Sequence, residues 1–121
     1  MSVKAVLLGD AMIPGVKFGE AWDKILSRFG SKLVGDWEPA WDKLQCRRLE
    51  VEKHGPEGEV VDELILGEGK DADMLLGLFV PVSSKVMAAM PNLRVVGVSR
   101  AGLENVNVAE ATKRGILVFN V

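Results

Sequence analysis

The 121-residue chain has one cysteine, one histidine and no tyrosine. A single cysteine excludes an internal disulfide and is typical of a reducing cytoplasm. A structural zinc site needs clustered histidine and cysteine ligands, and a Ser–His–Asp triad needs a correctly placed imidazole. The one imidazole belongs to His54, beside a Gly-Pro loop, where we interpret it as an exposed or packing residue. We therefore expect no metal site in this chain.

Long apolar runs and a charge excess are also missing. No run approaches the roughly 20 residues of a membrane-spanning helix, and residues 3–8 are too short for a signal peptide. The formal net charge is −2, which gives no general attraction to nucleic acid or anionic lipid. We expect a single cytoplasmic domain over residues 1–121, with neither nucleic acid nor a membrane as partner.

Glycine-rich loops that cradle phosphates are absent as well. Gly9 and Gly15 do not have the spacing of the dinucleotide fingerprint G-x-G-x-x-G, and Gly67-Glu68-Gly69 lacks its third glycine. Lys70 follows one glycine too closely for a P-loop, and no serine or threonine comes after it. The sequence therefore predicts no cofactor-binding residue within this chain.

Short apolar runs alternate with amphipathic segments along the chain. The runs predict strands at residues 3–8, 31–35, 74–80, 93–98 and 116–119. Helical spacing predicts helices over residues 18–29, 37–54, 84–90 and 108–114, and residues 60–66 fit either a strand or a helix. We expect the three tryptophans, Trp22, Trp37 and Trp41, to pack rather than to stack on a ligand.

The ends of the predicted helices carry recognisable signals. Ser83 or Ser84 can cap the third helix, and Asn107 can cap the fourth with Glu110 as the reciprocal acid three residues later. Gly115 stands where a left-handed residue ends that helix. These signals fix the register of the last third of the chain.

Strands that alternate with helices through short loops predict right-handed crossovers and a parallel sheet. About five strands in this length fit a flavodoxin-like, doubly wound α/β fold with three layers, α/β/α. Ligands of such sheets bind beyond the carboxyl ends of the strands. In this chain those ends are Gly9-Asp10, Phe79-Val80-Pro81 and Ser99-Arg100-Ala101-Gly102.

The last of these strand ends is the best candidate for an anion site. Small residues let backbone N–H groups approach a ligand, glycine permits a positive φ, and Arg100 adds a guanidinium for a carboxylate or phosphate. A tight turn with an exposed arginine explains the same residues. Asp10 fits a turn or capping role better than a phospho-acceptor, because the last strand offers no lysine.

Two consecutive segments resemble one family. The segment "PNLRVVGVSRAGLENVNVAEATKRGILVFNV" (91–121) resembles the end of the N-terminal half of D-isomer-specific 2-hydroxyacid dehydrogenases, the phosphoglycerate dehydrogenase-like enzymes. The segment "DADMLLGLFVPVSSKVMAAM" (71–90) resembles the strand, Pro-Val turn and helix that precede it. Only Leu103-Glu104 separates the R-A-G loop from the N-V-N helix start, as in a subgroup with a compact loop.

The resemblance implies a flavodoxin-like substrate-binding domain whose Rossmann NAD-binding partner is missing from these residues. The family's catalytic arginine, glutamate and histidine and its glycine fingerprint come after residue 121, so we expect a domain truncated at the hinge, inactive alone and without bound cofactor. The intact enzyme would use NAD or NADP, act on a small 2-hydroxy or 2-oxo acid and form a homodimer. By resemblance the substrate-binding residues are Phe79, Val80, Pro81, Ser99, Arg100, Ala101 and Gly102.

The residues leave one alternative open. A stand-alone flavodoxin-like module that binds a small anion, or regulates through one, would show the same fold and the same Arg100 loop without any chemistry of its own.

Overall fold

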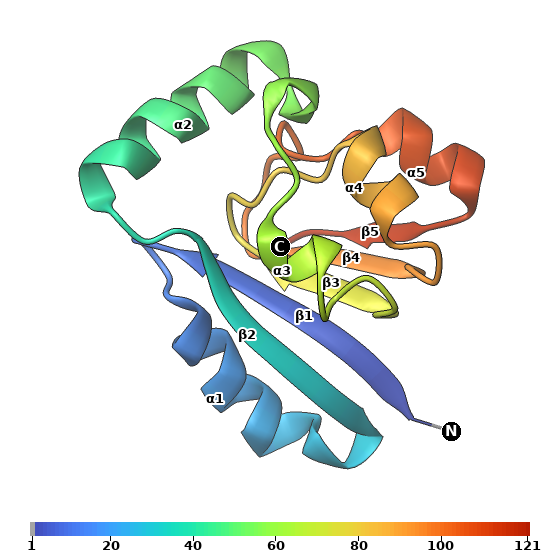
Figure 1. Cartoon of the computed structure of the whole chain (residues 1–121). Coiled ribbons are helices and arrows are strands. Elements are labelled where there is room, and N and C mark those ends of the chain that lie inside the picture. The colour runs from blue at the N-terminus through green and yellow to red at the C-terminus, as the bar shows by residue number, and fades with distance from the viewer. Residues whose placement is uncertain (1) are drawn as a thin grey trace.

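Parallel pairing builds the centre of the molecule. The computed structural model describes residues 2–121 and contains a five-stranded parallel sheet in the order β2-β1-β3-β4-β5. The strands are β1 (Val3–Asp10), β2 (Gly30–Glu38), β3 (Met74–Gly77), β4 (Val95–Val98) and β5 (Leu117–Phe119). This strand order confirms the predicted flavodoxin-like, doubly wound α/β fold, and the order reverses between β1 and β3 (Figure 1).

Helices cover the two faces of the sheet unequally. They are α1 (Gly15–Ile25), α2 (Trp41–His54), α3 (Glu63–Leu66), α4 (Ser84–Ala89) and α5 (Val108–Arg114), with 3-10 turns at Ser27–Phe29 and Pro56–Gly58. Figure 1 shows α1 alone on one face and α3, α4 and α5 on the other, while α2 lies beyond the strand ends. Within residues 2–121, no helix combines the length and the apolar character that crossing a bilayer requires.

The main core lies between the sheet and α3, α4 and α5. Alternate strand residues such as Val6, Leu8 and Leu75 face it and are fully buried. A smaller core on the other face joins Ala5 and Leu7 to Trp22 of α1. The main core thus anchors the loops that leave the carboxyl ends of β3 and β4.

Two packing predictions need correction. Trp22 and Trp37 are buried as expected, whereas Trp41 is 54% exposed, because the start of α2 lies off the sheet. The apolar stripe predicted along residues 18–29 is buried only in part, with Ile25 and Phe29 exposed. The α-helix ends at Ile25, and the following 3-10 turn carries Phe29 out of the stripe.

An apolar hollow remains on the α1 face, where no helix covers β4 and β5. It has a volume of about 330 Å³, and its apolar lining includes Phe18, Leu26, Leu76, Val98 and Phe119. Leu117 of the edge strand is 63% exposed on the same side of the sheet. The three-layer arrangement is therefore complete only over the β2–β1–β3 half of the sheet.

The predicted helix caps of the last third are present, with one exception. Ser83 Oγ accepts the Val86 N–H, and Asn107 Oδ1 accepts the Glu110 N–H at 3.0 Å. Gly115 ends α5 in the left-handed conformation, with φ 70°. The reciprocal bond predicted for Glu110 is wrong, because its carboxylate binds Arg114 instead.

β2 is longer than its predicted span of residues 31–35 and contains a bulge. Gly9 pairs with Asp36 and Asp10 pairs with Glu38, so Trp37 is an extra residue opposite β1. The bulge breaks the usual alternation of faces, and the consecutive residues Trp37 and Glu38 are both buried. The chain enters α2 directly after this irregularity.

Candidate functional site at the carboxyl edge of the sheet

A buried carboxylate links the ends of β1 and β3, where the strand order reverses. Asp10 is 1% exposed, and its carboxylate accepts the backbone N–H groups of Met12 at 2.8 Å and Ile13 at 3.1 Å. Its second oxygen accepts the Phe79 N–H at 3.3 Å. These bonds confirm the predicted turn and capping role, and they use the carboxylate to hold the Phe79 loop.

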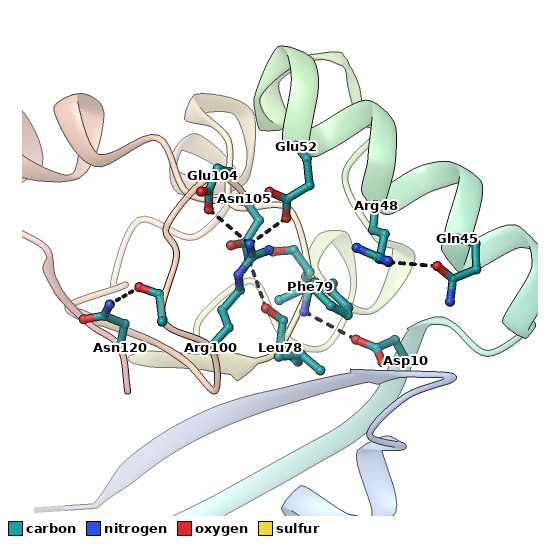
Figure 2. Close-up of polar contacts among 12 residues, drawn as sticks. Asp10, Gln45, Arg48, Glu52, Leu78, Phe79, Arg100, Glu104, Asn105 and Asn120 are labelled. Carbon is teal, nitrogen blue, oxygen red and sulfur yellow. Dashed lines mark hydrogen bonds and ion pairs between the residues drawn. The ribbon is translucent and has the colours of Figure 1, made fainter.

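Asn105 holds the same loop from the other side. Its side chain is fully buried, and Nδ2 donates to the Leu78 carbonyl at 3.2 Å and to the Val80 carbonyl at 2.8 Å. The strand predicted to continue through residue 80 therefore ends at Gly77, because these carbonyls bind a side chain instead of a neighbouring strand. Phe79, Val80 and Pro81 are all buried, and the ring of Phe79 borders the polar groups above the edge (Figure 2).

Arg100 is ion-paired and mostly enclosed, in contrast to the exposed arginine of a simple turn. Its side chain is 15% exposed, and Nη2 lies 2.6 Å from the Glu52 carboxylate and 3.1 Å from the Glu104 carboxylate. The guanidinium carbon lies 5.2 Å from the centre of the Phe79 ring. Helix α2 and two loops that are far apart in the sequence therefore meet at this one cation, as Figure 2 shows.

Only some of the backbone N–H and C=O groups in the Ser99–Gly102 turn have a hydrogen-bond partner within residues 2–121. Ser99 N–H donates to the Gly77 carbonyl at 2.8 Å, and the Arg100 carbonyl accepts the Val121 N–H at 3.2 Å. Within residues 2–121, the N–H groups of Ala101 and Gly102 have no hydrogen-bond acceptor. Two donors are thus available beside the Arg100 guanidinium.

Gly102 does not use the positive φ that glycine permits, since within residues 2–121 Gly55 and Gly115 alone have φ in the left-handed region. A side chain at Gly102 would instead meet Glu104, whose Oε2 lies 2.2 Å from the position of an added Cβ. Glycine therefore gives the Glu104 carboxylate room to reach Arg100. A carboxylate of the protein itself lies against the proposed anion-binding turn.

α2 adds polar side chains that the sequence prediction missed. Arg48 lies with its guanidinium carbon 5.4 Å from the centre of the Phe79 ring, and its Nε donates to Gln45 Oε1 at 3.0 Å. Glu52 follows one turn later and reaches Arg100. A polar helix that directly follows a strand of a parallel sheet starts at the carboxyl edge. The polar character of residues 41–54 could therefore have identified Arg48 and Glu52 as residues near the site.

Ion pairs and an aromatic contact hold the base of α2, together with the buried Leu44. Arg47 binds the carboxylates of Glu38, at 3.1 Å, and Glu59, and it stacks 4.3 Å from the centre of the Trp37 ring. The backbone N–H of Ala40 and the Arg47 guanidinium lower the pKa of Glu38, although its burial acts in the opposite direction. These contacts hold α2 above the strand ends.

Neither a metal nor a dinucleotide fits the residues around the first strand end. Within residues 2–121, no group of three or more histidine, cysteine, aspartate or glutamate side chains is placed to hold a metal ion. At the β1–α1 turn, Asp36 Oδ1 accepts the Gly15 N–H at 2.7 Å, so a carboxylate already binds the start of α1. An added Cβ at Gly9 would lie 2.1 Å from the Gly15 nitrogen, so the backbone of the turn packs directly against the end of β1.

Comparison with known sequences identifies relatives of one kind. Residues 36–121 match the family model described as "D-isomer specific 2-hydroxyacid dehydrogenase, catalytic domain". A glyoxylate reductase of Pyrococcus horikoshii is 38% identical over 79 residues, which cover 64% of this chain and 24% of that protein. A D-3-phosphoglycerate dehydrogenase of Mycobacterium bovis is 35% identical over 71 residues, or 59% of this chain and 13% of that protein.

The fold also matches solved structures along almost its whole length. The crystal structure of NAD⁺-bound 3-phosphoglycerate dehydrogenase of Entamoeba histolytica superimposes with a TM-score of 0.65 at 17% identity. The match covers 99% of this chain and 33% of that chain. These residues therefore correspond to about a third of the neighbouring structure.

Proposed function

This chain belongs to the D-isomer specific 2-hydroxyacid dehydrogenase family, and from that premise we propose that it is the substrate-binding part of an NAD-dependent oxidoreductase. The enzyme acts on the CH–OH group of a small D-2-hydroxy acid, or on the corresponding 2-oxo acid. The names of its relatives, a glyoxylate reductase and a D-3-phosphoglycerate dehydrogenase, support a small acid as substrate.

The main observation that supports this proposal is the position of the Glu104 carboxylate. It contacts Arg100 and lies against Gly102, beside the two N–H groups that lack an acceptor within residues 2–121. We infer that a substrate carboxylate takes this place, accepting hydrogen bonds from Ala101 and Gly102 and a charge-assisted bond from Arg100. Glu104 is the partner that moves, because its side chain is 47% exposed whereas that of Glu52 is 26% exposed.

The loop after β3 completes the site in this proposal. The Phe79 ring forms the wall next to Arg100, and the buried Val80 and Pro81 support the loop from below. Ser99 fixes the start of the turn through its bond to Gly77. These residues bind and orient the acid and hold no group placed to move its proton.

NAD belongs to another part of the enzyme in this proposal. The turn after β1 has a carboxylate where a pyrophosphate would bind, and the NAD⁺-bound structural neighbour is about three times as long as the matched region. NAD supplies the redox chemistry, while residues 1–121 supply the acid-binding surface. We expect the chain alone to bind no NAD, to be inactive and to form part of a homodimer when intact.

Titration of the ¹⁵N-labelled chain with glyoxylate tests the acid-binding surface. We expect the amide signals of Ala101 and Gly102 to shift and saturate, and Arg100→Gln to weaken binding about tenfold through loss of a charge-assisted bond. Glu104→Ala should tighten binding by up to about fivefold, since it removes a competing carboxylate. Arg94→Gln, at the opposite end of the strands, is the matched control.

Shifts confined to residues away from the carboxyl edge would contradict the proposed site. A parallel titration with NADH tests the proposal that NAD binds outside residues 1–121. Saturable micromolar binding of NADH by the 121-residue chain would show that a dinucleotide site exists within it.

A further inference from the structure

Two guanidinium groups lie at the same aromatic ring, and only one of them is neutralised. The carbon atoms of the Arg48 and Arg100 guanidiniums lie 5.4 Å and 5.2 Å from the centre of the Phe79 ring. Arg100 is bound by the carboxylates of Glu52 and Glu104. Arg48 contacts the neutral side-chain oxygen of Gln45 and has no carboxylate partner within residues 2–121.

The lack of a carboxylate partner sets Arg48 apart from the other arginines at the carboxyl edge. Arg47, Arg100 and Arg114 each bind at least one carboxylate. Arg28 lies in the 3-10 turn before β2, and Arg94 lies directly before β4, so both are at the amino ends of the strands. Arg48 is thus the one arginine at the carboxyl edge that carries an uncompensated charge.

The neighbouring carboxylates do not cancel that charge locally. Asp10 accepts three backbone N–H groups, and Glu52 points to Arg100 rather than to Arg48 (Figure 2). The Arg48 guanidinium has five N–H donors, of which Nε–H alone is used, on Gln45. Its remaining donors match the two-point geometry of a carboxylate or a phosphate.

We propose that Arg48 binds a second anionic group of the substrate, at the end away from the reacting carbon. The inference rests on the proposed function, because it takes the first carboxylate to bind at the Ala101–Gly102 turn. Because the guanidiniums of Arg48 and Arg100 both contact the Phe79 ring, an acid bound through Arg100 has a second guanidinium nearby for its other end. The site then selects 2-hydroxy acids with two negatively charged ends, carboxylate or phosphate, and Arg48 is the residue that determines this specificity.

Two pairs of acids that differ only in the second charge separate the possibilities. D-2-hydroxyglutarate is compared with D-2-hydroxypentanoate, and 3-phospho-D-glycerate with D-glycerate, each by ¹⁵N titration of the full 121-residue chain. We expect the doubly charged acid of a pair to bind about tenfold more tightly. The pair with the larger ratio identifies whether a carboxylate or a phosphate is the better second group.

Variants of Arg48 assign the preference to that side chain. Arg48→Gln should reduce each ratio to about one, mainly by weakening the binding of the doubly charged acid, and Arg48→Lys should restore part of the ratio. Arg94→Gln is the control and should leave both ratios as in the unaltered chain. Added salt should reduce the ratios, because the preference is electrostatic.

The possible failures are distinct. If no acid shifts the amide signals of Ala101 and Gly102, the proposed function is wrong, and the proposed role of Arg48 in substrate specificity is wrong as well. If the acids shift these signals but the ratios are about one, or survive Arg48→Gln, the acid-binding surface stands and the specificity role of Arg48 is overturned.

Discussion

Glu52 and Arg100 form an ion pair of 2.6 Å that joins α2 to the turn after β4. The pair is mostly enclosed, with side-chain exposures of 26% and 15%. Leu44 and Val51 anchor α2 in the main core, and this contact and the Arg47 cluster add polar links that help to position the helix. The position of α2 and the shape of the proposed acid site are therefore coupled.

A double-mutant cycle measures this coupling. Glu52→Gln, Arg100→Gln and the double variant should give an interaction energy of about 1 kcal/mol in urea unfolding, at the upper end of values for surface pairs because this pair is partly enclosed. The same cycle on Glu110 and Arg114, spaced i,i+4 on α5, should give about 0.3–0.5 kcal/mol. Equal values for the two pairs would contradict the special role of Glu52.

Asn105 should contribute strongly to stability. Asn105→Ala leaves the buried carbonyls of Leu78 and Val80 without their donor and opens a small void, which should cost about 2–3 kcal/mol of unfolding free energy. Asn92→Ala, on an exposed turn, should stay within about 0.5 kcal/mol. Chemical denaturation followed by circular dichroism compares the two, and a loss for Asn105→Ala as small as the control's would rule out the bridging role.

The two ends of α5 should each be sensitive to a single substitution. Asn107→Ala removes the cap on the Glu110 N–H and should cost about 1 kcal/mol, whereas Asn107→Ser keeps a capping oxygen and should cost less. Gly115→Ala forces an alanine into φ 70° and should also cost about 1 kcal/mol. Thermal and urea unfolding test all three, and an unchanged midpoint for Gly115→Ala would be inconsistent with the left-handed geometry.

Glu57 should make stability depend on pH in the acid range. Hydrogen bonds from the Ser84 side chain, the Asn107 amide and the Ser84 backbone N–H lower its pKa below the ordinary value of 4.5. A carboxylate with a lowered pKa in the folded state stabilises the protein above its unfolded pKa, and this stabilisation is lost as pH falls through the folded value. Stability should therefore decline below about pH 4.5.

The variant Glu57→Gln removes this contribution. Its unfolding free energy should fall less than that of the unaltered chain between about pH 5 and about pH 3. Ser84→Ala, which removes only the hydroxyl donor, should give an intermediate slope. The unfolding free energy of all three proteins is measured by urea unfolding at a series of pH values. If it falls equally with pH in all three, Glu57 is excluded as a source of the pH dependence.

Periodicity and caps were enough to predict the sheet order and most of the last third of the chain. Residues 74–77 are apolar because helices cover both faces of β3, and residues 95–98 are apolar because one face of β4 packs on the main core and the other borders the apolar hollow, which leaves a clear signal. Asn107 and Gly115 act through the local backbone, so their residue types alone reveal their roles. The position of the Arg100 turn at the carboxyl edge follows directly from the parallel order.

The rest of the site could not be predicted because it depends on long-range pairing of charges. Nothing local shows that Glu52 binds Arg100, or that Glu104 lies against Gly102. The exposed Trp41 shows the same limit, since its burial was inferred from its residue type while α2 leaves the sheet. Helical spacing puts Arg48 on the same face as Leu44 and Val51, but it does not reveal that the guanidinium lies at the Phe79 ring.

Because of the bulge at Trp37, the direction in which α2 leaves the sheet depends on the number of residues in β2 as well as on their side chains. Side chains on a strand alternate between faces, so deleting one residue at this point would exchange the faces of every position after it. Glu38 would then turn away from Arg47, and the helix would leave the sheet in a different direction. A deletion or insertion of one residue around position 37 should therefore redirect α2 more than a substitution at the same place.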